Sequence, residues 1–135
     1  MRRTAAALAA LLLAGAAQAA DAPPPRVAII TSDVERFFAL YDDPAIAGQP
    51  DLLAARYLAE PTPGFAEFMT LRRITPERLA TALRDKRQVF DDARGCAAKL
   101  GGVRPRLIAA TDRLAALYPQ AKFPPSTIAI GRAAT

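Results

Sequence analysis

The chain has 135 residues, of which 52% are hydrophobic and 23% charged, and its formal net charge is +5. This balance is typical of one globular domain rather than of a disordered chain. The sequence contains no histidine and one cysteine, which excludes nucleophilic systems built on a histidine base and the usual histidine or four-cysteine zinc sites within it. Carboxylates, tyrosines, lysines, arginines and one thiol are left to carry any chemistry.

The first 19 residues have the composition of a secretory signal peptide. Arg2 and Arg3 precede a run of alanine and leucine, and Ala17-Gln18-Ala19 has the small-x-small pattern of a cleavage site. The uncharged stretch 4–20 has 17 residues, and as a helix it spans ~25 Å, less than the ~30 Å hydrocarbon core of a bilayer. We therefore expect cleavage near Ala19, a periplasmic or secreted location, and no stable membrane anchor after cleavage.

Charge pattern and cysteine content give two further expectations. The arginines are scattered among acids, and only Lys86, Lys99 and Lys122 are lysines, so we expect no nucleic-acid binding, which needs a basic stripe or stacking aromatics. Cys96 stands among small residues on a predicted helix, where a buried, inert thiol is the expected state. The alternative in an oxidising compartment is pairing with a cysteine of another molecule.

Residues 20–26 are predicted to be an extended proline-rich leader, and 27–135 a single helical domain. Residues 27–31 form a short β-type run, and the Ser32-x-x-Glu35 spacing predicts a capping box that starts a helix at once. Four residues then share one apolar helical face before Asp42-Asp43-Pro44 ends the helix: Val34, Phe37, Phe38 and Tyr41. Such a stripe is more typical of a core face than of a partner-binding face.

Three helical segments follow in the middle of the chain. Pro50 opens the first, which ends at 60–64 and carries one apolar side: Leu52, Leu53, Tyr57 and Leu58. A short turn of helix is predicted around Phe65, Phe68 and Met69. Thr75 is the predicted N-cap of the next helix, with Pro76 at its first position and Ile74 spaced to pack on Leu79.

The last third of the chain predicts two helices and a strand. Residues 89–100 form a weaker helix, because Gly95 costs ~1 kcal/mol inside it and Gly101-Gly102 is expected to break it. The last helix runs from about Pro105 to Tyr118, and its inward face is predicted to hold Leu107, Ala110, Leu114, Leu117 and Tyr118.

The last predicted element is a β-type run at 126–131. A strand needs a neighbouring strand to satisfy its backbone hydrogen bonds. Either it pairs with 27–31, or the sheet that receives Ile128 and Ile130 lies in sequence that this chain lacks. The predicted fold class is therefore mainly α, with five to six short helices and one or two short β-strands, and α+β if such a downstream sheet is counted.

Four sets of polar residues are candidates for chemistry, and each has a plainer explanation. Asp42-Asp43 and Asp91-Asp92 are adjacent acids that could hold Ca²⁺, but consecutive helical residues do not face one another, so solvated helix ends are expected. Glu60 and Glu67 could form a glycosidase pair, yet the chain offers few aromatic platforms for sugar. Ser126 near Lys122 suggests a Ser-Lys pair, but the prolines between them predict an extended entry into a strand.

Three stretches together resemble one known family. They are Ile29 to Phe38; Tyr57-Leu58 with Pro63-Gly64-Phe65 and Phe68; and Leu117 to Pro125 running into 128–131. The pattern resembles the amino-terminal half of a family of exported bacterial proteins described as predicted zinc-dependent proteases, and the match covers about Val27 to Gly131.

In that family the strand similar to 128–131 is followed by further strands and by a helix with a His-Glu-x-x-His motif, whose histidines bind zinc and whose glutamate activates water. This sequence has no such motif. The resemblance therefore assigns no catalytic, cofactor-binding or metal-binding residue here, and zinc is expected only with a downstream segment of that kind.

Three functional interpretations follow. The first is an exported helical scaffold, the front part of such a protease-like protein, which is catalytically inert as it stands. The second is a free-standing secreted binding or inhibitory helical module. The third is a small hydrolase that works through carboxylates alone. We expect a protein partner, or the missing carboxyl-terminal half, to bind through Ile128 and Ile130.

Overall fold

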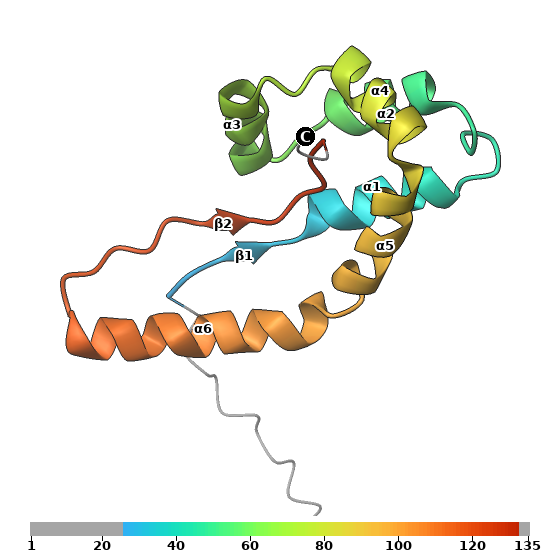
Figure 1. The fold of residues 1–135 in the computed structure, drawn as a ribbon. Coiled ribbons are helices and arrows are strands. Elements are labelled where there is room, and N and C mark those ends of the chain that lie inside the picture. The colour runs from blue at the N-terminus through green and yellow to red at the C-terminus, as the bar shows by residue number, and fades with distance from the viewer. Residues whose placement is uncertain (1–25, 133–135) are drawn as a thin grey trace, which may run out of the picture.

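The computed structural model describes residues 26–132 (Figure 1). The predicted signal peptide and nearly all of the proline-rich leader lie outside these residues. In chain order the elements are β1 (Ile29–Ile30), α1 (Ser32–Asp42), α2 (Pro50–Ala59), α3 (Pro63–Arg72), α4 (Pro76–Asp85), α5 (Arg87–Ala97), α6 (Leu100–Leu117) and β2 (Ser126–Thr127). The fold is mainly helical with one short pair of strands, as the sequence predicts.

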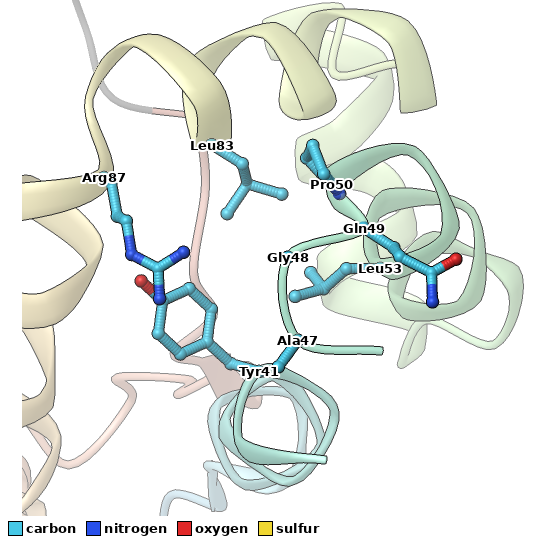
Figure 2. A pocket seen from close by; sticks show the side chains of 8 residues that line it. All are labelled: Tyr41, Ala47, Gly48, Gln49, Pro50, Leu53, Leu83 and Arg87. Carbon is cyan, nitrogen blue, oxygen red and sulfur yellow. The ribbon is translucent and has the colours of Figure 1, made fainter. Parts of the chain in front are cut away.

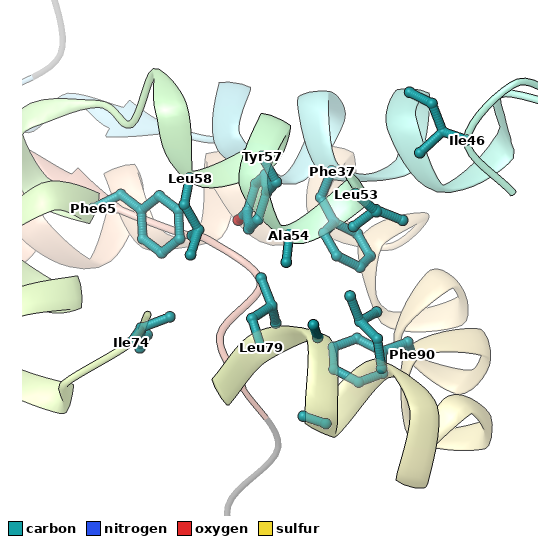
Figure 3. Packing of buried hydrophobic residues seen from close by; sticks show 13 residues of the cluster. Phe37, Ile46, Leu53, Ala54, Tyr57, Leu58, Phe65, Ile74, Leu79 and Phe90 are labelled. Atoms are coloured by element: carbon teal, nitrogen blue, oxygen red, sulfur yellow. The ribbon is translucent and has the colours of Figure 1, made fainter. Parts of the chain in front are cut away.

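The hydrophobic core lies among α1 to α5, and its centre is the contact between α2 and α4. Figure 3 shows the buried side chains of these helices converging on this centre, with Tyr57 between Phe37 and Phe65. The Tyr57 ring centroid lies 5.0 Å from that of Phe37 and 5.2 Å from that of Phe65, distances at which aromatic pairs attract one another. Phe37 is fully buried while Phe38 and Tyr41 pack at the margin of the core, which confirms the aromatic stripe as a core face.

The helix starts agree with the sequence at α4 and differ at α1. Thr75 caps α4 by accepting a hydrogen bond from the Arg78 N–H at 3.3 Å. At α1 the N-cap is Thr31 rather than Ser32, and its hydroxyl donates to the Glu35 carboxylate at 3.0 Å. The capping box predicted at Ser32 is not formed, because Ser32 is itself the first residue of α1 and the side chain of the N-cap Thr31 accepts no hydrogen bond from a backbone N–H of the helix.

α3 is longer than the short turn predicted from Phe65, Phe68 and Met69, since it covers ten residues. Its start is secured by Thr62, whose hydroxyl accepts from the Phe65 N–H at 3.4 Å, and by Pro63 at the first helical position. This combination of cap and N-terminal proline is the usual start signal of a full helix, so the sequence contained the signal although the prediction treated 60–64 only as a stop.

The expected break at Gly101-Gly102 is wrong. The break between the two helices lies before the glycines, at Ala98-Lys99. α6 begins at Leu100 and includes both glycines and Pro105. The N–H groups of Gly102 and Val103 both donate to the Lys99 carbonyl, at 3.0 and 3.1 Å. Glycine in a helix costs ~1 kcal/mol without forbidding it, and these glycines stand in the first turn, where few helical bonds exist to lose.

The predicted inward face of the last helix is also wrong. Leu107, Leu114, Leu117 and Tyr118 are exposed, the last two by 79% and 67%. Ala115 is the buried residue of α6, and Ile108 and Thr111 beside it are half-buried. α6 lies apart from the helical core and runs beside the strand pair (Figure 1), so it buries one narrow side and leaves its larger apolar side open.

β1 and β2 are parallel neighbours although all six helices separate them in the chain. Ile29 pairs with Ser126 and Ile30 with Thr127. This settles one of the two alternatives left open by the sequence: the run 126–131 does find a partner in 27–31.

Candidate functional site

The adjacent acid pairs are engaged in surface interactions. Asp42 forms a two-pronged ion pair with Arg94, with Nη1 to Oδ2 at 2.7 Å, and this hydrogen bond to Arg94 lowers the pKa of the Asp42 carboxyl. Asp43 accepts from the Ala45 N–H at 2.9 Å and ends α1. Asp91 accepts from Tyr41 and Asp92 from Gln88, at 2.6 and 2.8 Å. These contacts fix helix ends and join α1 to α5.

The other candidate pairs are not assembled. Glu60 and Glu67 are both exposed, on the end of α2 and on α3. Ser126 uses its backbone N–H to bond the Ala28 carbonyl, and no hydrogen bond joins its side chain to Lys122 within the described residues. Cys96 is exposed rather than buried, because α5 turns its Phe90 side to the core and leaves Cys96 in solvent.

A small cavity lies where α1 and α2 meet the α4–α5 junction. Figure 2 shows Tyr41, Leu53, Leu83 and Arg87 among the side chains around it. Its volume is about 30 Å³, which is room for a water molecule and not for a substrate. Burial and the hydrogen bond to Asp91 raise the pKa of Tyr41 to about 12, so this phenol is a protonated donor and not a base at neutral pH.

The residues present do not fit a zinc centre. The whole sequence has no histidine and one cysteine, and no three acidic or cysteine residues cluster as metal ligands between residues 26 and 132. Zinc prefers nitrogen and sulfur ligands in a four-coordinate set. No catalytic step through zinc can be assigned to these side chains.

A buried charged network joins the starts of α1 and α3. Asp33 is the buried charged residue of the described core, with 0% exposure. It accepts from the Arg36 guanidinium at 2.7 Å, from the Thr62 N–H at 3.2 Å and from the Thr62 hydroxyl at 2.5 Å. A buried carboxylate is tolerated only when paired and hydrogen-bonded, so this set of donors explains how Asp33 can be buried.

The same network continues to α2 through Arg36. The guanidinium also donates to the Tyr57 carbonyl at 3.1 Å and lies over the Tyr57 ring, 5.4 Å from its centroid. One arginine therefore holds the ends of α1 and α2 together by an ion pair, a backbone contact and a cation–π contact.

The Tyr57 hydroxyl is the anchor of the segment after β2. It accepts from the Ile130 N–H at 3.0 Å and donates to the Ile130 carbonyl at 3.1 Å. Burial raises the pKa of the Tyr57 phenol above its ordinary value, so the hydroxyl keeps the proton that it donates. A single side chain thus satisfies both backbone groups of Ile130, as a neighbouring strand would.

A groove of about 410 Å³ runs between β2 and α3. Pro125, Thr127 and Ala129 line it on the strand side, and Glu67 and Phe68 line it on the helix side. Gly64 lets the two elements approach closely, because a Cβ there would clash with the Thr127 hydroxyl. This groove, together with the network behind it, is the candidate functional site.

Sequence reasoning named Glu67 as a candidate but missed the buried network of this site. Asp33 and Thr62 were treated as parts of a capping pattern and a helix stop, and Tyr57 only as a core aromatic. The Thr62-Pro63 pair was a usable signal for a helix start. The pairing of Asp33 with Thr62 left no signal, because the two residues are 29 positions apart and one sequence carries no record of such contacts.

Comparisons of the chain with known protein families, curated proteins and solved structures found no match. No family model matches the chain, and neither a curated protein nor a solved structure matches it significantly. Between residues 26 and 132 no helix is long and apolar enough to cross a membrane.

Proposed function

We propose that this chain is the non-catalytic helical scaffold region of an exported protein similar to the predicted zinc-dependent proteases. In this proposal residues 26–132 are inert by themselves. Their role is to hold the strand at 126–130 in place for a catalytic half whose zinc ligands would come from a downstream His-Glu-x-x-His segment.

The observation that carries the proposal is that the three stretches behind the resemblance meet in one bonded unit. Asp33, from the first stretch, bonds Thr62 just before Pro63-Gly64-Phe65. Tyr57, from the second stretch, bonds Ile130 of the third across 73 positions. Short patterns that recur by chance need not converge in space, so their convergence supports treating them as one inherited unit.

The coding sequence after the Thr135 codon tests this proposal. We expect it to continue in frame to a His-Glu-x-x-His helix. A stop codon directly after Thr135, together with a stably folded secreted product, would contradict the proposal. Stoichiometric zinc in the purified 135-residue chain, measured by elemental mass spectrometry, would also contradict it, because the described residues lack a ligand set.

The exposed side of α6 favours a second candidate, a secreted binding module. Leu107, Leu114, Leu117 and Tyr118 are large apolar side chains exposed along α6 and at its end, and exposed apolar patches are typical of interaction sites. The stop codon and folded product described above would favour this candidate. Its further requirement is that substitutions on α6 weaken binding of an identified partner without unfolding the protein.

A further inference from the structure

The exposed side of α6 carries a regular sequence pattern that the packing of the described residues does not use. Its apolar residues recur at alternate intervals of four and three positions: Val103, Leu107, Ala110, Leu114 and Leu117. These intervals place them in one line along the helix, which is the a/d seam through which two helices pack in a coiled coil. Leu107, Leu114 and Leu117 are exposed by 41%, 46% and 79%, so most of this seam is open between residues 26 and 132.

Positive charge borders the seam on one side. Arg106 and Arg113 are seven positions apart, and each stands directly before a seam leucine, at the g position of the heptad. Both are exposed, and neither forms an ion pair within the described part of the chain. They line one open depression along the helix together with the first two residues of the seam. The single acidic residue of α6, Asp112, instead lies beside Arg26, with 3.9 Å between Oδ1 and Nε.

We propose that this seam binds an amphipathic helix of a partner protein whose flanking residues are acidic. The apolar residues of the partner would pack between Leu107, Leu114 and Leu117, and its glutamates or aspartates would pair with Arg106 and Arg113. Charged residues at these flanking positions set partner choice and orientation in coiled coils. The inference rests on the binding-module candidate, for which it names the class of partner, and it is independent of the scaffold role.

Charge disfavours a second copy of this chain as the occupant. In an antiparallel pair of α6 helices the g positions face one another, so Arg106 and Arg113 of the two copies would repel. In a parallel pair they would face the e positions, where Thr111 and Tyr118 offer no negative charge. The two arginines therefore favour a partner that supplies the acids.

The shape of the apolar side disfavours a membrane surface as the occupant. Helices that lie in the interface of a bilayer present a broad apolar face, commonly with tryptophan or phenylalanine. α6 has neither residue, and its open apolar side is one narrow line with an alanine at its centre. Such a line is the geometry of helix–helix contact.

The experiment titrates the purified chain into a labelled synthetic peptide of three heptads, with leucine at a and d and glutamate at e and g. Repulsion among its glutamates keeps this peptide from pairing with itself at pH 7. Fluorescence anisotropy should give saturable binding with a Kd on the order of 10–100 µM, and circular dichroism should show a gain of helix on mixing. The same peptide with lysine at e and g should bind at least ~10-fold more weakly.

Two double variants separate the seam from its charges. Leu107→Gln with Leu114→Gln places unpaired amides in the contact and should weaken binding of the glutamate peptide at least ~10-fold. Ala116→Gln is the matched control, because this exposed position lies on another side of α6. Arg106→Glu with Arg113→Glu should reverse the preference, so that the lysine peptide binds more tightly than the glutamate peptide. Misfolding cannot produce such a reversal, so this result does not depend on the stability of the variant.

Five results would overturn the proposal: no binding of the glutamate peptide, equal binding of the two peptides, unchanged binding after the leucine substitutions, self-association in sedimentation that those substitutions abolish, or binding to phosphatidylglycerol vesicles in place of the peptide. The last two would assign the seam to a second copy and to a membrane surface. Equal binding of the two peptides through α6 would leave the binding-module candidate standing and remove only its acidic partner. None of these outcomes bears on the coding sequence after Thr135, so this inference and the scaffold proposal can fail separately.

Discussion

The Tyr57 hydroxyl makes the two backbone hydrogen bonds that a residue of a neighbouring strand would make with Ile130. β1 ends at Ile30 because Thr31 already caps α1, so no β1 residue lies opposite Ile130 to complete the pairing. The Tyr57 hydroxyl takes that place by accepting from the Ile130 N–H and donating to its carbonyl. The segment after β2 is therefore attached to the core by the side chain of a helix residue and not by a longer β1 strand.

Replacing Tyr57 by phenylalanine should lower the free energy of unfolding by about 1–3 kcal/mol, because the backbone N–H and C=O of the half-buried Ile130 lose their only described partner. The amide of Ile130 should also exchange faster with solvent. Tyr41→Phe is the matched control, since it removes a hydroxyl whose partner Asp91 is exposed. Denaturant unfolding of both variants measures the effect, and equal losses in the two would show that Tyr57 does not anchor the strand.

At the scale of elements, sequence periodicity predicted where the helices lie better than it predicted which side of each helix is buried. The cap at Thr75 and the aromatic face of α1 are local patterns, and both are confirmed. The orientation of α6 is not local: its periodic leucines predict an amphipathic helix, but which side is covered depends on what packs against it. Arg26, which precedes β1, lies against α6 with its Nε 3.9 Å from Asp112 Oδ1, and Ala115 is the residue of α6 that is buried.

The exposed side of α6 gives a prediction at this scale. Leu117→Gln should change the free energy of unfolding by less than ~0.5 kcal/mol, as expected for an exposed position. Leu79→Ala, at a fully buried position of α4, should cost about 2–5 kcal/mol. Chemical denaturation of the two variants provides the comparison. A loss above ~1 kcal/mol at Leu117 would mean that this leucine is covered in solution by something other than the described residues.

At the scale of the whole molecule, the chain divides its buried surface unevenly. The core among α1 to α5 holds the large buried side chains, including Phe37, Tyr57 and Leu79. The strand pair and α6 bury fewer, mainly Val27, Ile29 and Ala115. The bonds from Tyr57 to Ile130 connect the two parts, so the smaller part depends on the larger for its position.

This division predicts that α6 opens more readily than the core helices in native-state hydrogen exchange. Amides of α2 and α4 should exchange only through global unfolding, because these helices form the centre of the core. Amides of α6 should exchange through openings of lower free energy, since one residue of that helix is fully buried and regions with few buried apolar contacts open first. Exchange measured at increasing low denaturant concentrations separates the two classes by their slopes. Equal free energies for α6 and α4 would show instead that the molecule unfolds as one unit, with α6 held by contacts as strong as those of the core.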